Sequence, residues 1–207
     1  MNRSRFASRI RFAHSNLSLG PVIAVVRHLR HMIATLEAGL PGTGPLPVHL
    51  HTGKPTPWSE GCVVRFTPRA GDEWIGNLQS GYGYATKVTE WPEANAVVVI
   101  AKGATYFIRP DHPNDWIYID LLGIDCIVAP TGELAVLSTY TDVVAISVDG
   151  AERWRRSIAI DGVEITKIES GLIHGSACID PPDEWHPFAL QLETGNDAEQ
   201  TDEREPE

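Results

Sequence analysis

After residue 61, apolar residues fall in short runs or alternate with polar ones, and turn residues separate the runs, as is typical of β-strands. The clearest stretch is 133–156, where apolar runs at 134–139 and 143–148 flank a short polar break. The second run ends at Asp149-Gly150, a pair that favours a tight hairpin turn because it tolerates positive φ. A third strand is expected to continue through Trp154.

The strands of this stretch differ in which faces are apolar. In 143–148 both alternating sets of side chains are small or apolar, so we expect both faces to be covered. Trp154 falls on the opposite face from Arg153 and Arg155, so that strand should have one solvated face. The continuous apolar run NAVVVIA, at 95–101, predicts another central strand.

Turn residues divide the rest of the range 61–195 into further short strands. The additional strand segments are CVVRFTP, EWIGNLQ, YATKVTE, ATYFIR, WIYIDL, DCIVAP, VEITKIE, LIHGSACI and HPFALQLE. The sequence therefore predicts an all-β fold over 61–195, mainly antiparallel, with blade-like hairpin repeats in a compact sandwich or partial-propeller-like domain.

The segments before residue 61 have a different character. Residues 1–19 are rich in Arg and Ser and contain no acid, which predicts a flexible basic arm and is also typical of an organelle transit peptide. Residues 20–39 are expected to form an amphipathic helix, because apolar residues recur at three- and four-residue spacing. Residues 40–60 are rich in Pro and Gly and predict an extended linker.

Three segments resemble one another in their order of elements. Each has an apolar strand, a small-residue break, a second strand, a polar turn and an aromatic residue, and they begin at residues 96, 134 and 172. The central copy, DVVAISVDGAERWR at 142–155, resembles the repeat of PQQ-type and related β-propellers, where a strand ending in Asp-Gly is followed by Trp. The resemblance implies blade-like sheets, in too few copies for an ordinary closed propeller. A sandwich or small barrel, an open stack of sheets, or a propeller completed by other subunits would fit.

Charge and composition narrow the range of partners. The 207-residue chain has a formal net charge of −10, which argues against binding nucleic acid. No apolar run reaches the roughly 20 residues of a membrane helix. Cys62, Cys126 and Cys178 lie far apart without a CxxC motif, which predicts buried, reduced thiols in a cytoplasmic protein. The acidic residues 196–207 predict a disordered tail.

Metal-binding and catalytic patterns are weak. His49 and His51 alternate in an extended segment and are the best candidates for metal ligands. A third ligand could come from Asp111, His112, His174 or His186. Acids beside His112 and His186 would suit general acid–base catalysis, although the same residues are typical of turns. The chain has no nucleophile elbow, P-loop, zinc-protease or dinucleotide motif, and we predict no cofactor.

Aromatic residues are the strongest candidates for a binding surface. The chain has six tryptophans, several at junctions between loops and strands, where an exposed ring can anchor a partner. The candidate binding residues are Trp58, Trp91, Trp116 and Trp185, with Tyr82 and Tyr84 of the glycine-rich turn at 80–87. The alternative is that the tryptophans cap the β core.

These patterns favour a non-enzymatic module that binds a protein partner. Small immunity and antitoxin proteins are an analogy, because they are often acidic and lack catalytic signatures. The alternative is a hydrolase that uses His and Asp residues, with or without a metal ion. A third hypothesis is a subunit that completes a larger β assembly through an exposed edge strand. The oligomeric state stays open.

Overall fold

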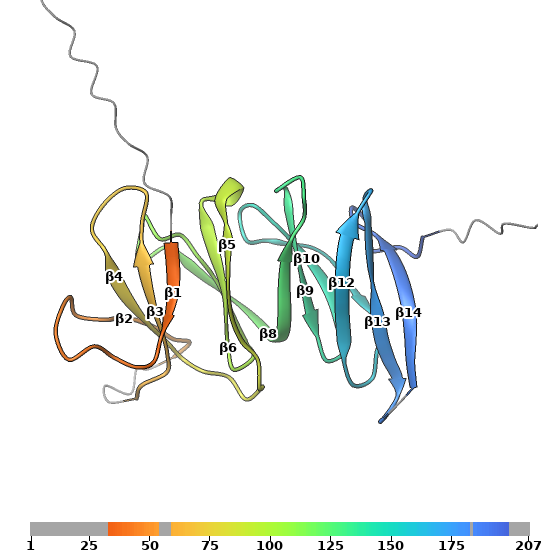
Figure 1. Ribbon diagram of the computed structural model, residues 1–207, viewed down its shortest axis with the longest axis horizontal. Helices are drawn as coiled ribbons and strands as arrows, with labels where there is room; N and C mark the ends of the chain where they lie inside the picture. Colours follow the sequence, from red (N-terminus) through yellow and green to blue (C-terminus); the bar gives the residue numbers. More distant parts are fainter. Residues whose placement is uncertain (1–32, 54–58, 183, 199–207) are drawn as a thin grey trace, which may run out of the picture.

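The computed structural model describes residues 33–53, 59–182 and 184–198 (Figure 1). In these ranges the chain is mostly β-strand, and the one helical segment there is the 3-10 helix η1 (Pro92–Ala94). The strands form three sheets whose pairs are mostly antiparallel. The predicted all-β fold is therefore confirmed.

The first sheet takes strands from both sides of residue 61. Its strands are β1 (Ile33–Glu37), β2 (Val48–Leu50), β3 (Cys62–Thr67) and β4 (Trp74–Leu78). They lie in the order β1-β3-β4-β2, and only the β2–β4 pair is parallel. The range 40–60, predicted as a linker, therefore contributes one short strand to this sheet.

The predicted helix over 20–39 is wrong where the structure describes it. Residues Ile33–Glu37 form β1, which pairs antiparallel with β3 along its whole length. Ala34 packs against the apolar core beneath the sheet. Pairing with β3 supplies hydrogen-bond partners for this segment, and it overrides a helical pattern whose apolar residues lie mostly before residue 33. The rest of that helix, residues 20–32, and the predicted arm 1–19 lie outside the described residues.

The second sheet has seven strands and folds over on itself at the long strand β8. Its strands are β5 (Thr86–Trp91), β6 (Ala96–Ala101), β7 (Ala104–Ile108), β8 (Trp116–Val128), β9 (Leu134–Thr139), β10 (Asp142–Ser147) and β11 (Glu152–Ser157). The first part of β8 pairs with β7 and the later part with β9, and both pairings contain a register shift. The sheet therefore makes two layers, β5–β8 and β8–β11, that share β8.

The third sheet is a meander of β12 (Val163–Glu169), β13 (Leu172–Asp180) and β14 (Glu184–Gln191). The start of the predicted disordered tail is ordered against β14. The amide of Ala198 donates to the carbonyl of Ala189 at 2.9 Å, and the amide of Gln191 donates to the carbonyl of Asn196 at 2.8 Å. Residues 199–207 lie outside the described residues.

Four layers thus follow one another along the long axis of the molecule, in the order of the sequence (Figure 1). Three apolar cores separate them. Strand β6 shows how one strand serves two cores: Val97 and Val99 pack toward the first layer, and Val98 and Ile100 pack toward the third. The sheets lie in a row and do not circle an axis, so the described chain is an open stack and not a closed propeller or barrel.

Three tryptophans link neighbouring layers. In each case the indole N–H donates to a backbone carbonyl that belongs to the next layer. The bonds run from Trp74 to Pro110 (2.9 Å), from Trp91 to Gly132 (2.7 Å) and from Trp154 to Leu192 (2.9 Å). A large apolar ring with one polar atom suits such a position, because the ring fills the core and the N–H satisfies a loop carbonyl.

Candidate functional site

The six candidate binding residues lie in different environments. Trp58 is outside the described residues. Trp91 is completely buried, and its side chain packs in the second apolar core. Trp116 is half-buried beside Tyr106, with 6.0 Å between the ring centroids. The three exposed residues are Tyr82, Tyr84 and Trp185.

Tyr84 and Trp185 are far apart in the sequence but line the same cavity, which has a volume of about 220 Å³. Tyr84 is 72% exposed and Trp185 is 45% exposed. The other lining residues come from β8 and from the start of β12: Ile124, Asp125, Gly162, Val163, Glu164 and Ile165. We call this cavity the aromatic pocket. Tyr82 lines a separate cavity of about 240 Å³.

The segment that carries Tyr84 is docked against the turn between β6 and β7. The amide of Gly81 donates to the carbonyl of Ala101 at 2.8 Å, and the amide of Gly83 donates to the carbonyl of Lys102 at 2.7 Å. A Cβ atom at Gly81 would lie 2.7 Å from backbone atoms, so only glycine allows this approach. The glycine-rich turn at 80–87 is therefore a crossover between the first two layers, because β4 and β5 belong to different sheets.

Trp185 lies at the start of β14, and its ring covers Gly162. Gly162 has φ +131°, and a Cβ atom there would lie 2.9 Å from the Trp185 ring. The amide of Gly162 donates to the carbonyl of Tyr140 at 2.6 Å, which ties the start of the fourth layer to the β9–β10 turn. Glycine at this position therefore lets the indole lie close to the backbone.

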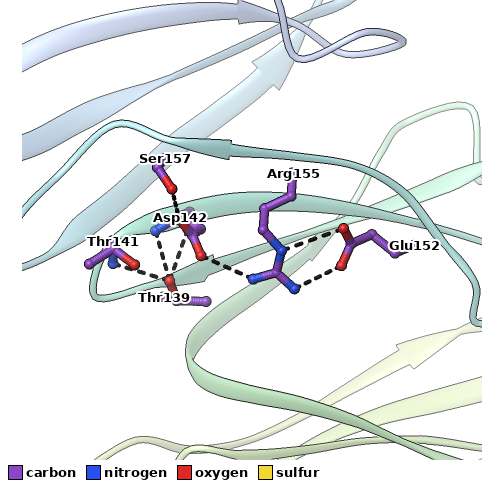
Figure 2. Close-up of polar contacts among 6 residues, drawn as sticks. All are labelled: Thr139, Thr141, Asp142, Glu152, Arg155 and Ser157. Atoms are coloured by element: carbon purple, nitrogen blue, oxygen red, sulfur yellow. Dashed lines mark hydrogen bonds and ion pairs between the residues drawn. The ribbon is translucent and has the colours of Figure 1, made fainter.

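The β9–β10 turn is held by a polar network (Figure 2). The hydroxyl oxygen of Thr139 accepts hydrogen bonds from the amides of Thr141 at 3.1 Å and Asp142 at 2.8 Å. The carboxylate of Asp142 accepts from the hydroxyl of Ser157 and from Arg155 Nη1, the latter at 3.0 Å. The turn also carries Tyr140, whose ring meets that of Tyr84 edge-on, with 6.0 Å between centroids. The network thus fixes an aromatic neighbour of the pocket.

The same network has little capacity for catalysis. Burial raises the pKa of Asp142, but the hydrogen bonds from Ser157 and Arg155 outweigh burial, and the net pKa is below its ordinary value. Arg155 is also paired with Glu152 at 2.7 Å. A carboxylate stabilised in this way is a weak base, and the network contains no imidazole to activate Ser157.

The two acidic residues of the aromatic pocket differ in their partners. Asp125 forms an ion pair with the ammonium group of Lys87 on β5, and it also accepts a hydrogen bond from the amide of Cys126. Glu164 is exposed, and within the described ranges its carboxylate makes no ion pair or hydrogen bond. The pocket therefore offers one carboxylate that is not neutralised.

His49 and His51 line another cavity, of about 330 Å³, together with Glu60, Asn77 and Gln79. The Nδ1 atom of His49 lies 3.2 Å from the side-chain nitrogen of Asn77. The Nδ1 atom of His51 is buried and has no hydrogen-bond partner among the described residues. In the part of the chain that the structure describes, no group of three His, Cys, Asp or Glu side chains is placed to hold a metal ion.

The two loops that combine an acid with histidine differ in their contacts. The carboxylate of Asp111 accepts hydrogen bonds from the amide of Ala70 at 3.1 Å and from the side chain of Asn95 at 2.9 Å. Burial raises the pKa of Asp111, but these bonds outweigh it and the net pKa is lowered. His186 forms an exposed pair with Glu184 at 2.8 Å. Neither loop brings its acid and histidine to one of the three cavities described above.

Sequence reasoning missed several residues of the aromatic pocket. It did not single out Ile124 or Glu164, which line the pocket, or Tyr140, which contacts Tyr84. These residues meet only because β8, β12 and the β9–β10 turn come together in the stack. The pattern of apolar and polar residues along the chain does not predict which of these segments lie side by side.

The described residues contain no helix that is long and apolar enough to span a membrane. No protein-family model matches the chain, and a search of the curated proteins finds no match either. The function is therefore inferred from the geometry of the sites.

Proposed function

We propose that this protein is a non-enzymatic binding module whose aromatic pocket receives part of a protein partner. The observation that carries the proposal is that Tyr84 and Trp185, two exposed aromatic residues about 100 positions apart in the sequence, line one cavity. Rigid aromatic side chains with a free polar atom are enriched where proteins bind each other.

The contrast among the tryptophans supports this proposal. Trp74, Trp91 and Trp154 use their indole N–H groups within the protein. In the described residues, Trp185 makes no hydrogen bond through its indole, and almost half of the side chain is open to solvent. An exposed indole with an unused donor loses little on desolvation when a partner supplies an acceptor.

The cellular setting is part of the proposal. Cys62, Cys126 and Cys178 are all buried and form no disulfide. Burial raises the pKa of Cys62 to about 11 and that of Cys126 to about 12, so both thiols stay protonated at neutral pH. Buried, reduced cysteines agree with a reducing compartment and therefore with a cytoplasmic protein.

The test compares proteins that co-purify with the tagged full chain and with three variants. We expect Trp185→Ala and Tyr84→Ala to lower the yield of a specific partner by about tenfold or more, the usual loss at an anchor residue. Tyr82→Ala is the matched control, because Tyr82 is an exposed tyrosine of the same segment outside the pocket. A partner set that is unchanged in all variants, or equally reduced in the control, would contradict the proposal.

A hydrolase is the second candidate, and one observation favours it. The cavity of His49, His51 and Glu60 contains a buried imidazole nitrogen that has no hydrogen-bond partner in the ranges the structure describes, and a substrate group could contact it. Hydrolysis of ester, amide and phosphoester model substrates that is lost on His51→Gln would support this candidate. Hydrolysis that is unaffected by this substitution, or absent altogether, would count against it.

A further inference from the structure

We infer that the aromatic pocket recognises an arginine side chain on a basic segment of the partner. This inference rests on the proposed function and names the chemistry of the partner. Two exposed aromatic side chains, Tyr84 and Trp185, line the pocket together with the carboxylate of Glu164, which no described residue neutralises. A guanidinium group combines the two properties that such a site selects, a flat face and a permanent positive charge.

The aromatic side chains would contact the flat face of the guanidinium group. Trp185 and Tyr84 are both exposed at the pocket, and Tyr140 supports Tyr84 edge-on. Cation–π attraction is strongest for tryptophan and is commoner with arginine than with lysine. The outer edge of the Trp185 ring lies close to Gly162, and 45% of the residue is exposed, so the indole is anchored against the backbone and still accessible to a ligand.

The charge of the pocket points to the same ligand. Lys87 neutralises Asp125, so Glu164 supplies the net negative charge of the lining residues. Carboxylates bind guanidinium groups through two parallel hydrogen bonds, which a single ammonium group cannot reproduce. The net charge of −10 on the whole chain also favours the approach of a basic segment.

The experiment follows the Trp185 indole resonance of the full chain, labelled with ¹⁵N at tryptophan, during addition of a blocked Gly-Arg-Gly peptide. A peptide of the same length with citrulline in place of arginine keeps the shape and removes the charge. We expect the arginine peptide to shift the Trp185 resonance, and the citrulline peptide to bind about fivefold to tenfold more weakly.

Two variants isolate the contribution of the carboxylate. Glu164→Gln should weaken binding of the arginine peptide by about fivefold, whereas Glu169→Gln should change it less than about twofold. Glu169 is the matched control, because it lies on the same strand, carries the same charge and does not line the pocket. Equal binding of both peptides, or equal affinity of Glu164→Gln and the wild type, would overturn the inference.

The outcomes separate this inference from the proposed function. If Trp185→Ala weakens the partner's binding but arginine and citrulline peptides bind with equal affinity, the proposal of a binding module is supported and the inference of arginine recognition is contradicted. Residues 1–32 of this chain contain six arginines and no acid, so they are a competing occupant. Two results together would assign the pocket to that segment and overturn the assignment to a partner. The first is a change in the Trp185 chemical shift caused by Glu164→Gln in the absence of peptide, and the second is no change in that shift when peptide is added.

Discussion

The second layer and the fourth layer differ in the burial of their two faces. All six residues of β6 are buried, because cores lie on both sides of the strand. In β12, buried Val163, Ile165 and Ile168 alternate with exposed polar residues. The sequence of β6 is therefore a continuous apolar run, whereas the sequence of β12 alternates between apolar and polar residues.

The polar face of β12 marks the C-terminal end of the stack. A repeat at the end of a stack needs a polar outer face, since it has only one neighbour. The last sheet meets this requirement, because Glu164, Lys167 and Glu169 on β12 are exposed. The same layer carries the exposed Trp185, so the end of the stack is also where an aromatic side chain is free to meet a partner.

The largest expected effect is that of a charge placed in the second layer. Val98→Asp would bury an unpaired carboxylate between the second and third layers, where Val98 is completely inaccessible. We expect the free energy of unfolding to fall by about 4 kcal/mol or more. Thr166→Asp on the outer layer is the control and should lower it by less than about 1.5 kcal/mol, because Thr166 is exposed and loses only the hydrogen bond to the carbonyl of His174. Similar losses measured for the two variants by chemical denaturation would break the comparison between layers.

A smaller effect is expected from tryptophans that differ in their partners. Trp91→Phe removes the hydrogen bond to the Gly132 carbonyl and part of a buried ring, and should cost about 2–4 kcal/mol of unfolding free energy. Trp185→Phe should cost less than about 1 kcal/mol, because its side chain is partly exposed and donates no bond within the described chain. Denaturation curves that rank the two variants in the opposite order would contradict the assigned roles.

The junction between the third and fourth layers should be sensitive to Gly162. Gly162→Ala introduces a Cβ atom against the Trp185 ring at a positive φ, and should cost about 1–3 kcal/mol. Gly171→Ala also has a positive φ but has open space around it, so it separates backbone strain from the clash. Thermal or chemical unfolding that shows equal losses for the two variants would exclude a specific role for the contact with Trp185.

The smallest expected effect is on the acid side of the stability profile. The pKa of Asp142 is lower in the folded protein than the ordinary value of about 3.9, so its contribution to stability is present above that pH and is lost as the pH falls. Asp142→Asn should cost about 1 kcal/mol at pH 7, and its difference from the wild type should shrink as the pH falls below about 4. Denaturation at several pH values tests this, and a difference that is constant between pH 3 and pH 7 would contradict it.

The fold was largely predictable, because a continuous apolar run indicates a strand buried on both faces and an apolar–polar alternation indicates a strand buried on one face. The continuous apolar run at 95–101 predicts a central strand, and the structure has the fully buried strand β6 there. The strand β1 was not predictable, since its partner β3 is separated from it by the Pro- and Gly-rich segment. The three-residue strand β2 within that segment is too short to show a pattern of its own.

The candidate site was predictable only in part. Residue type and position at loop–strand junctions drew attention to Trp185, and the glycine-rich turn drew attention to Tyr84. The same reasoning also selected Trp91, which proves to be buried, because the sequence carries no sign of which indole finds a carbonyl in the next layer. The meeting of Tyr84 with Trp185 depends on how the layers stack, which is a property of the tertiary structure alone.

Hydrogen exchange of the indole N–H groups, followed by NMR on the ¹⁵N-tryptophan-labelled chain, tests the division between structural and free tryptophans most directly. We predict that the indoles of Trp74, Trp91 and Trp154 exchange slowly, since each donates to a carbonyl of the neighbouring layer, and that the indole of Trp185 exchanges fast. A Trp185 indole as protected as that of Trp91 would contradict the account.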